Sequence, residues 1–179
     1  FAFTKIGGRS VFLLCDGMGS GTGAARESRL MSALLKDFLH AGMPPSSALS
    51  ALTGALSLRG GVNGGFTTVD LLRLDLFSGS TELFKLGSAP TYLRRGGLVS
   101  RLSGSALPAG LEGGRESEPD VTRFRLSAED YVLLVTADHG NADVMLEKNK
   151  KGEKKGRKKG VESMSEKKII IKRDRKSVV

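Results

Sequence analysis

The spacing of hydrophobic residues changes along the chain and predicts helices first and strands afterwards. Residues 11–15 form an unbroken apolar run, which is typical of a strand buried on both faces. Residues 24–39 carry apolar side chains at intervals of three and four, with charged side chains between them, which predicts an amphipathic helix that ends before Gly42. A second helix is expected over residues 46–56, where either of two adjacent serines can cap the first turn.

From residue 67 onward the pattern changes to short segments in which apolar and polar residues alternate, as in strands with one buried and one exposed face. Glycine- and serine-rich turns separate the expected strands, which span residues 72–76, 81–86, 91–94, 98–102, 121–126 and 131–136. A polar loop is expected over residues 113–119. Helices that precede antiparallel strands predict an α+β fold and argue against a parallel βαβ array.

The first apolar run ends in Asp16, which is followed by Gly17, Gly19 and Gly21. A carboxylate at a strand end faces solvent or a metal ion, and Mg²⁺ and Mn²⁺ prefer carboxylate, carbonyl and water oxygens. The alternative is that Asp16 and Gly17 simply make a tight hairpin turn, which the short spacing taken alone favours.

The net charge of +9 comes entirely from the last part of the chain. Residues 1–146 hold 14 basic and 14 acidic side chains, whereas residues 147–179 hold 14 basic and 5 acidic ones. We therefore predict one domain over residues 1–146, followed by a basic tail. The tail has no aromatic residue to stack on bases and no groove-reading motif, so specific nucleic-acid binding is not expected.

Within the tail, residues 147–168 are charged and of low complexity, which predicts disorder. Residues 169–171 are its one apolar segment, and they can add an edge strand to the domain. Because the tail offers little apolar surface, we expect truncation of the chain after Met145 to change the melting temperature by only about a degree or two.

The composition also limits location and chemistry. No apolar run is long enough to span a bilayer, and no signal segment opens the chain. The single cysteine, Cys15, fits a reducing compartment, and its place in an apolar run without a neighbouring base predicts a core residue and not a nucleophile. Because the first residue is Phe1, the chain is expected to begin inside a longer protein.

Five motifs, in this order, resemble the phosphatase domain of stage II sporulation protein E and its stress-response relatives, within the protein phosphatase 2C superfamily. The motifs are residues 16–21 with Ala25, Glu27 and Ser28 behind them, then residues 56–59, 67–71, 85–90 and 107–110. The resemblance covers roughly residues 1–138, and it makes a metal site the favoured interpretation of Asp16.

The resemblance implies an αββα sandwich of two antiparallel sheets flanked by helices, with two Mg²⁺ or Mn²⁺ ions at one end. It implies that Asp16 binds metal through its carboxylate and Gly17 through its carbonyl, and that Asp138 takes the place of a second metal aspartate. Phosphoserine would be hydrolysed directly by metal-activated water, so no side chain is expected as a catalytic nucleophile. The implied partner is a phosphorylated regulatory protein such as an anti-sigma-factor antagonist, and the implied location is the cytoplasm, with an anchor elsewhere in the parent protein left open.

Around Asp138 the chain departs from the family pattern. The usual Ser-Asp-Gly is replaced by Ala137-Asp138-His139, and the final Asp-Asp-Met-Thr-like strand of the family is absent. An aspartate that the family carries upstream of the first strand would fall before Phe1. The domain is therefore predicted to be truncated at both ends. The alternative function is a catalytically incomplete phosphatase fold that binds partners.

Residues 136–143 resemble a second family, because Thr-Ala-Asp-His-Gly-Asn-Ala-Asp is similar to the metal-binding signature of cofactor-independent phosphoglycerate mutase. That signature implies Mn²⁺ binding by the adjacent Asp138 and His139, and adds a phosphoglycerate mutase-like enzyme as a lesser alternative. The alternative for His139 is that it is a solvated loop residue without a functional role. That enzyme needs further histidines for its second metal site, and the chain has 2 histidines in total, so the second site cannot be built.

Two unrelated resemblances meet within one expected strand, and basic-residue usage then changes from arginine to lysine. Residues 174–179 also match what a common sequencing adapter encodes. These observations lead to the hypothesis that about 40 C-terminal residues are not native to the phosphatase domain.

Overall fold

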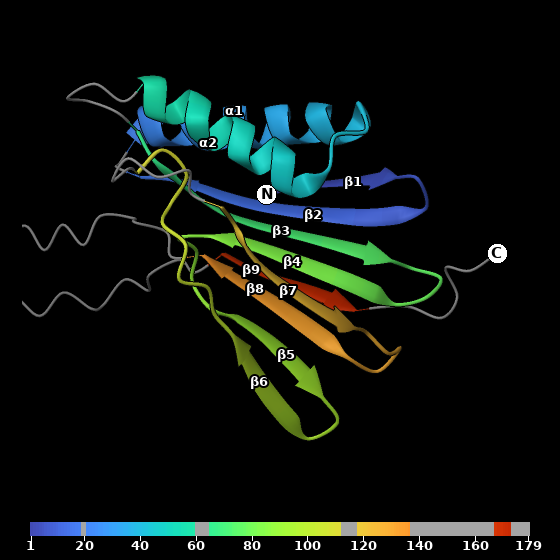
Figure 1. Cartoon of the computed structure of the whole chain (residues 1–179). Helices are drawn as coiled ribbons and strands as arrows, with labels where there is room; N and C mark the ends of the chain where they lie inside the picture. Colours follow the sequence, from blue (N-terminus) through green and yellow to red (C-terminus); the bar gives the residue numbers. More distant parts are fainter. Residues whose placement is uncertain (19–20, 60–64, 112–117, 137–166, 173–179) are drawn as a thin grey trace, which may run out of the picture.

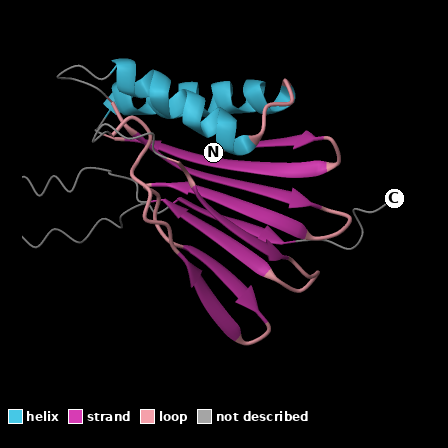
Figure 2. Cartoon of the chain, in the orientation of Figure 1, coloured by secondary structure: helices cyan, strands magenta, loops and turns pink. Residues whose placement is uncertain are grey.

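The computed structural model describes residues 1–18, 21–59, 65–111, 118–136 and 167–172. Two antiparallel sheets and two helices make up the described part, and the helices lie over one face of the first sheet (Figures 1 and 2). This confirms the predicted α+β fold with two antiparallel sheets. Among the described residues, helices cover the first sheet only, whereas the αββα expectation includes helices on both outer faces.

The first sheet has five strands in the order β1-β2-β3-β4-β7. The strands are β1 (Ala2–Ile6), β2 (Arg9–Gly17), β3 (Thr67–Asp75), β4 (Ser80–Leu86) and β7 (Asp120–Arg125). The register of β2 with β3 places Leu14 opposite Asp70 and Asp16 opposite Thr68. The polar ends of β2 and β3 therefore lie side by side.

The second sheet has four strands in the order β6-β5-β8-β9. The strands are β5 (Thr91–Arg95), β6 (Leu98–Leu102), β8 (Tyr131–Thr136) and β9 (Lys167–Lys172). The chain crosses from the first sheet to the second between β4 and β5, and returns to the first sheet at β7 (Figure 1).

The helices are α1 (Gly21–His40) and α2 (Pro45–Arg59). Gly42 ends α1 as expected: its φ is 84°, its N–H donates to the carbonyl of Leu39, and the N–H of Met43 donates to the carbonyl of Phe38. The second helix starts at Pro45, one residue before the expected serines, because proline fits the first helical position. No helix among the described residues is long and apolar enough to cross a membrane.

Each face of β2 contributes to a different part of the core. Val11, Leu13 and Cys15 pack under the helices, whereas Leu14 packs between the two sheets. This explains why the run at residues 11–15 does not alternate. Burial raises the pKa of the Cys15 thiol to about 11, and the prediction of an inert core cysteine agrees with this environment.

The C-terminal strand β9 pairs with β8 along the edge of the second sheet, from Tyr131 opposite Lys172 to Thr136 opposite Lys167. It contains the edge strand anticipated at residues 169–171. Residues 167–168, predicted to be disordered, are part of β9. Ile171 is 3% exposed and belongs to the apolar cluster between the sheets, so this contact argues against the expectation that removal of the tail barely changes the melting temperature. The rest of the predicted tail lies outside the described residues.

Candidate metal centre

Asp16 occupies the end of β2, one residue before the strand finishes at Gly17. Its side chain is half-buried, and its Oδ2 accepts a hydrogen bond of 3.0 Å from the hydroxyl of Thr136, the last residue of β8. The ends of β2 and β8 therefore meet across the two sheets. Strand β2 pairs with β3 only after both helices have intervened, so the alternative of a tight hairpin turn at Asp16 is wrong.

Gly17 is in close contact with α1. Its N–H donates to the hydroxyl of Ser28 at 2.7 Å, and that hydroxyl donates to the carbonyl of Ala24 at 3.0 Å. A Cβ on Gly17 would lie 2.5 Å from the Ala24 carbonyl oxygen. The position therefore needs glycine because the helix backbone approaches it closely.

The donor chemistry of Asp16 and Gly17 fits a hard divalent cation. In the described part of the chain, the hydrogen bond to the Asp16 carboxylate engages Oδ2, which leaves Oδ1 for a ligand. Gly17 itself is buried, and its peptide group directly follows the half-buried carboxylate of Asp16. Carboxylate and carbonyl oxygens are the ligands that Mg²⁺ and Mn²⁺ prefer.

The remaining candidate ligands are not part of this geometry. Asp138 and His139 lie outside the described residues, as do residues 137–143 of the phosphoglycerate mutase-like motif. Across the described ranges, no group of three or more His, Cys, Asp or Glu side chains is arranged to hold a metal ion. The structure thus describes the surroundings of Asp16 and Gly17, and all four residues remain predictions as metal ligands.

Sequence reasoning missed a buried ionic network beside this site. Lys85 on β4 donates to Asp70 Oδ1 at 2.5 Å, to the carbonyl of Ala89 at 2.8 Å and to the hydroxyl of Thr91 at 3.0 Å. The hydroxyl of Ser88 donates to the same Asp70 oxygen at 2.7 Å. The network ties β3 and β4 to the start of β5, where the chain changes sheets.

The two charged side chains of this network are almost fully buried, at 2% exposure for Lys85 and 1% for Asp70. Burial raises the pKa of Asp70, and the adjacent ammonium group of Lys85 opposes that rise. The signal in the sequence was an acid and a base next to apolar runs, in Val69-Asp70-Leu71-Leu72 and in Leu83-Phe84-Lys85-Leu86. Such residues are almost never fully buried unless they are paired.

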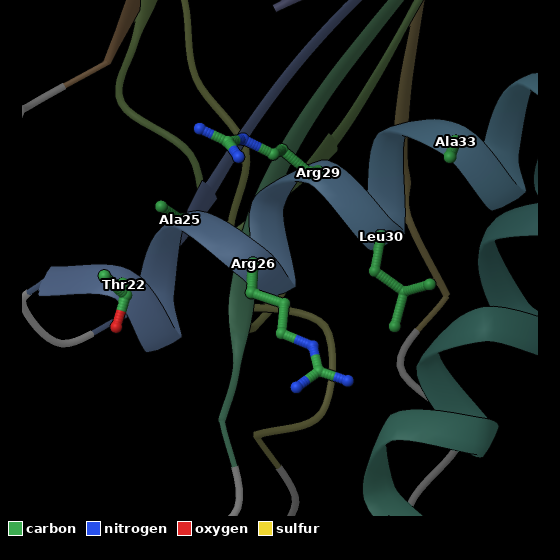
Figure 3. A pocket seen from close by; sticks show the side chains of 6 residues that line it. All are labelled: Thr22, Ala25, Arg26, Arg29, Leu30 and Ala33. Carbon is green, nitrogen blue, oxygen red and sulfur yellow. The ribbon is translucent and has the colours of Figure 1, made fainter.

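A separate hollow of about 450 Å³ runs along the surface of α1 (Figure 3). The lining residues are Thr22, Ala25, Arg26, Arg29, Leu30 and Ala33. All six come from one helix, and none of them is a predicted metal ligand. The hollow is therefore a feature of the helix surface and separate from the candidate metal centre.

Comparison with known proteins identifies the family. The family model of stage II sporulation protein E matches residues 6–165. A stage II sporulation protein E of Priestia megaterium is 33% identical over 129 residues, covering 72% of this chain and 22% of the relative. The chain belongs to the stage II sporulation protein E family.

A second member of the SpoIIE family, from Bacillus subtilis, is 30% identical over 137 residues, which cover 76% of this chain and 16% of the relative. The chain thus spans about a fifth of the length of these curated relatives or less. The family match also continues past residue 138, where the resemblance recognised from motifs stopped.

A solved structure supports the assignment of the fold to the SpoIIE family. The PP2C phosphatase domain with a fragment of the regulatory domain of SpoIIE from Bacillus subtilis superposes with a TM-score of 0.67 at 29% identity. The match covers 75% of this chain and 40% of that one. The described sandwich is therefore a PP2C-type fold, as the motifs predicted.

Proposed function

We propose that this chain is part of a divalent-metal-dependent serine phosphatase domain. The observation that carries the proposal is Asp16 at the end of β2, next to a glycine that accepts no side chain, in a member of the SpoIIE family. The proposed substrate is a phosphoserine on a regulatory protein, such as an anti-sigma-factor antagonist in sporulation or stress signalling. The proposed location of the domain is the cytoplasm.

Asp16 and Gly17 would hold Mg²⁺ or Mn²⁺ through a carboxylate and a carbonyl oxygen, and Asp138 and His139 are proposed as further ligands. When bound, such ions neutralise phosphoryl oxygens and activate water. The side chains of this protein orient and support the site. Thr136 holds one oxygen of Asp16, and Ser28 holds the amide of Gly17. No side chain of the chain is proposed as a nucleophile.

The test is phosphate release from phosphoserine peptides by the full chain, with and without Mn²⁺. We expect release that depends on Mn²⁺ and is abolished by Asp16→Asn. The matched control is Asp37→Asn on the exposed face of α1, which should leave the rate unchanged. Release that is indifferent to Mn²⁺, or that survives Asp16→Asn, would contradict the proposal.

The alternative of a phosphatase fold that binds partners without catalysis rests on the replacement of the family's Ser-Asp-Gly motif by Ala137-Asp138-His139. It predicts saturable binding of a phosphorylated partner protein without release of phosphate under the same conditions. Interconversion of 2- and 3-phosphoglycerate would instead favour the mutase-like alternative. The three functions are separated by assays on one preparation.

A further inference from the structure

One hydrogen bond joins the candidate metal ligand to the opposite sheet. The hydroxyl of Thr136 donates to Asp16 Oδ2 at 3.0 Å, although the two residues are 120 positions apart in the sequence. Thr136 is 9% exposed, and it ends a strand whose inward side chains Val132 and Leu134 are fully buried. The position of its hydroxyl is therefore set by the packing between the sheets.

We infer that Thr136 is a positioning residue for the Asp16 carboxylate, an inference that rests on the proposed function. A carboxylate at a strand end rotates readily about its terminal torsion, which has broad minima. A donor on Oδ2 fixes the plane of the carboxylate and reserves Oδ1 for the metal ion. Partners that orient metal-binding carboxylates in this way are usually needed for full affinity.

Threonine suits this role for two reasons. Its branched Cβ restricts χ1, so the hydroxyl has few alternative directions. Its methyl group also adds apolar volume at the inner face of β8, next to the cluster between the sheets. Serine keeps the hydroxyl and loses the methyl group, whereas valine keeps the shape and loses the donor. The two substitutions therefore separate hydrogen bonding from packing.

The experiment is calorimetric titration of the full chain with MnCl₂. Thr136→Val should raise the Kd for Mn²⁺ by about 10- to 100-fold, and Thr136→Ser should stay within about threefold of the original chain. The matched control is Thr81→Val on β4, which removes a buried threonine hydroxyl that donates to the carbonyl of Gly79 just before the strand. It should leave the Kd unchanged.

Thermal melts followed by circular dichroism establish that each variant is folded. If Thr136→Val does not fold, Thr136→Ala takes its place, because it also removes the donor and relieves any misfit of the second methyl group. The original chain is expected to bind Mn²⁺ saturably, and Asp16→Asn is expected to abolish this binding. If the variant without the Thr136 donor then binds Mn²⁺ at full affinity, the inference is overturned and the proposed function stands. No Asp16-dependent binding by the unmodified chain would overturn both the inference and the proposed function.

Discussion

Two aspartates face the space between the sheets at the same end of β2 and β3, and their surroundings differ. Asp70 is 1% exposed and is neutralised by Lys85, with a second donor from Ser88. Asp16 is half-buried, and the hydrogen bond to its carboxylate comes from the uncharged hydroxyl of Thr136. No ion pair to Asp16 exists among the described residues.

The difference separates a structural carboxylate from one suited to binding. A carboxylate that already has a buried cation gains little from a metal ion, and removing the cation leaves an uncompensated charge. A carboxylate oriented by a hydroxyl keeps its negative charge available to a ligand. The comparison therefore assigns Asp70 to holding the sheets together and Asp16 to the candidate metal centre.

The largest expected effect is from Lys85→Met, which leaves Asp70 buried without its partner. We expect a loss of about 3–5 kcal/mol in the free energy of unfolding, measured by urea denaturation at pH 7. The control is the double variant Lys85→Met with Asp70→Asn, which removes both charges and should recover most of the loss. A single variant as stable as the original chain would contradict the structural role of this pair.

The same variant has a predicted pH dependence. Burial raises the pKa of Asp70, and removing Lys85 removes the group that opposes this rise. A carboxyl whose pKa is raised in the folded state destabilises the protein fully above that pKa. The cost shrinks as the pH falls through that pKa and is gone below the unfolded pKa of about 3.9. The stability of Lys85→Met should therefore approach that of the double variant, which has no carboxyl at residue 70, as the pH falls.

An apolar contact between the sheets provides the next test. Ile171→Ala should cost about 2–3 kcal/mol, since the side chain is 3% exposed but lies on an edge strand. The neighbouring Ile170 is 68% exposed, so Ile170→Ala should change stability by less than about 0.5 kcal/mol. Equal and negligible effects of the two substitutions would favour the hypothesis that the C-terminal residues are adventitious.

A third carboxylate, that of Asp130, extends the comparison, with a smaller expected effect on stability. Arg95 and the N–H of Ser127 donate to Asp130, and they hold the pKa of that carboxyl below its usual range. Because the arginine is 55% exposed, Arg95→Gln should cost only about 1 kcal/mol at pH 7.

The pH dependence at Asp130 has the opposite sign to that at Asp70. A lowered folded-state pKa stabilises the protein above the unfolded pKa of about 3.9 and loses this effect as the pH falls through the folded value. The melting temperatures of Arg95→Gln and the original chain should therefore differ near neutral pH and converge in acid. A difference that does not shrink as the pH falls below the unfolded pKa of about 3.9 would contradict the assignment.

Much of the fold was predictable because local patterns and packing agree. The helix expected over residues 24–39 is α1 at Gly21–His40, and every expected strand is present, with residues 11–15 inside β2. Strand β3 begins at Thr67, earlier than the expected 72, because it is buried on both faces and its first half does not alternate. Strand β1 was not predicted, although the positive-φ pair Gly7 and Gly8 is a typical hairpin turn.

The site was predictable only in part. Asp16 and Gly17 stand out because acid and glycine follow an apolar run directly. The contacts of Asp16 with Thr136, and of Asp70 with Lys85, depend on which strands meet, and hydrophobic spacing in one sequence carries no information on pairing between distant segments. The structure supplied these partners, and with them the distinction between the two aspartates.

The most direct test of this distinction is a Mn²⁺ titration of two variants beside the original chain. The variants are Asp16→Asn and the charge-free pair Asp70→Asn with Lys85→Met, both verified as folded by thermal melts. We predict that Asp16→Asn abolishes saturable Mn²⁺ binding and that the charge-free pair binds Mn²⁺ as the original chain does. Retained binding in Asp16→Asn, or lost binding in the charge-free pair, would contradict the account.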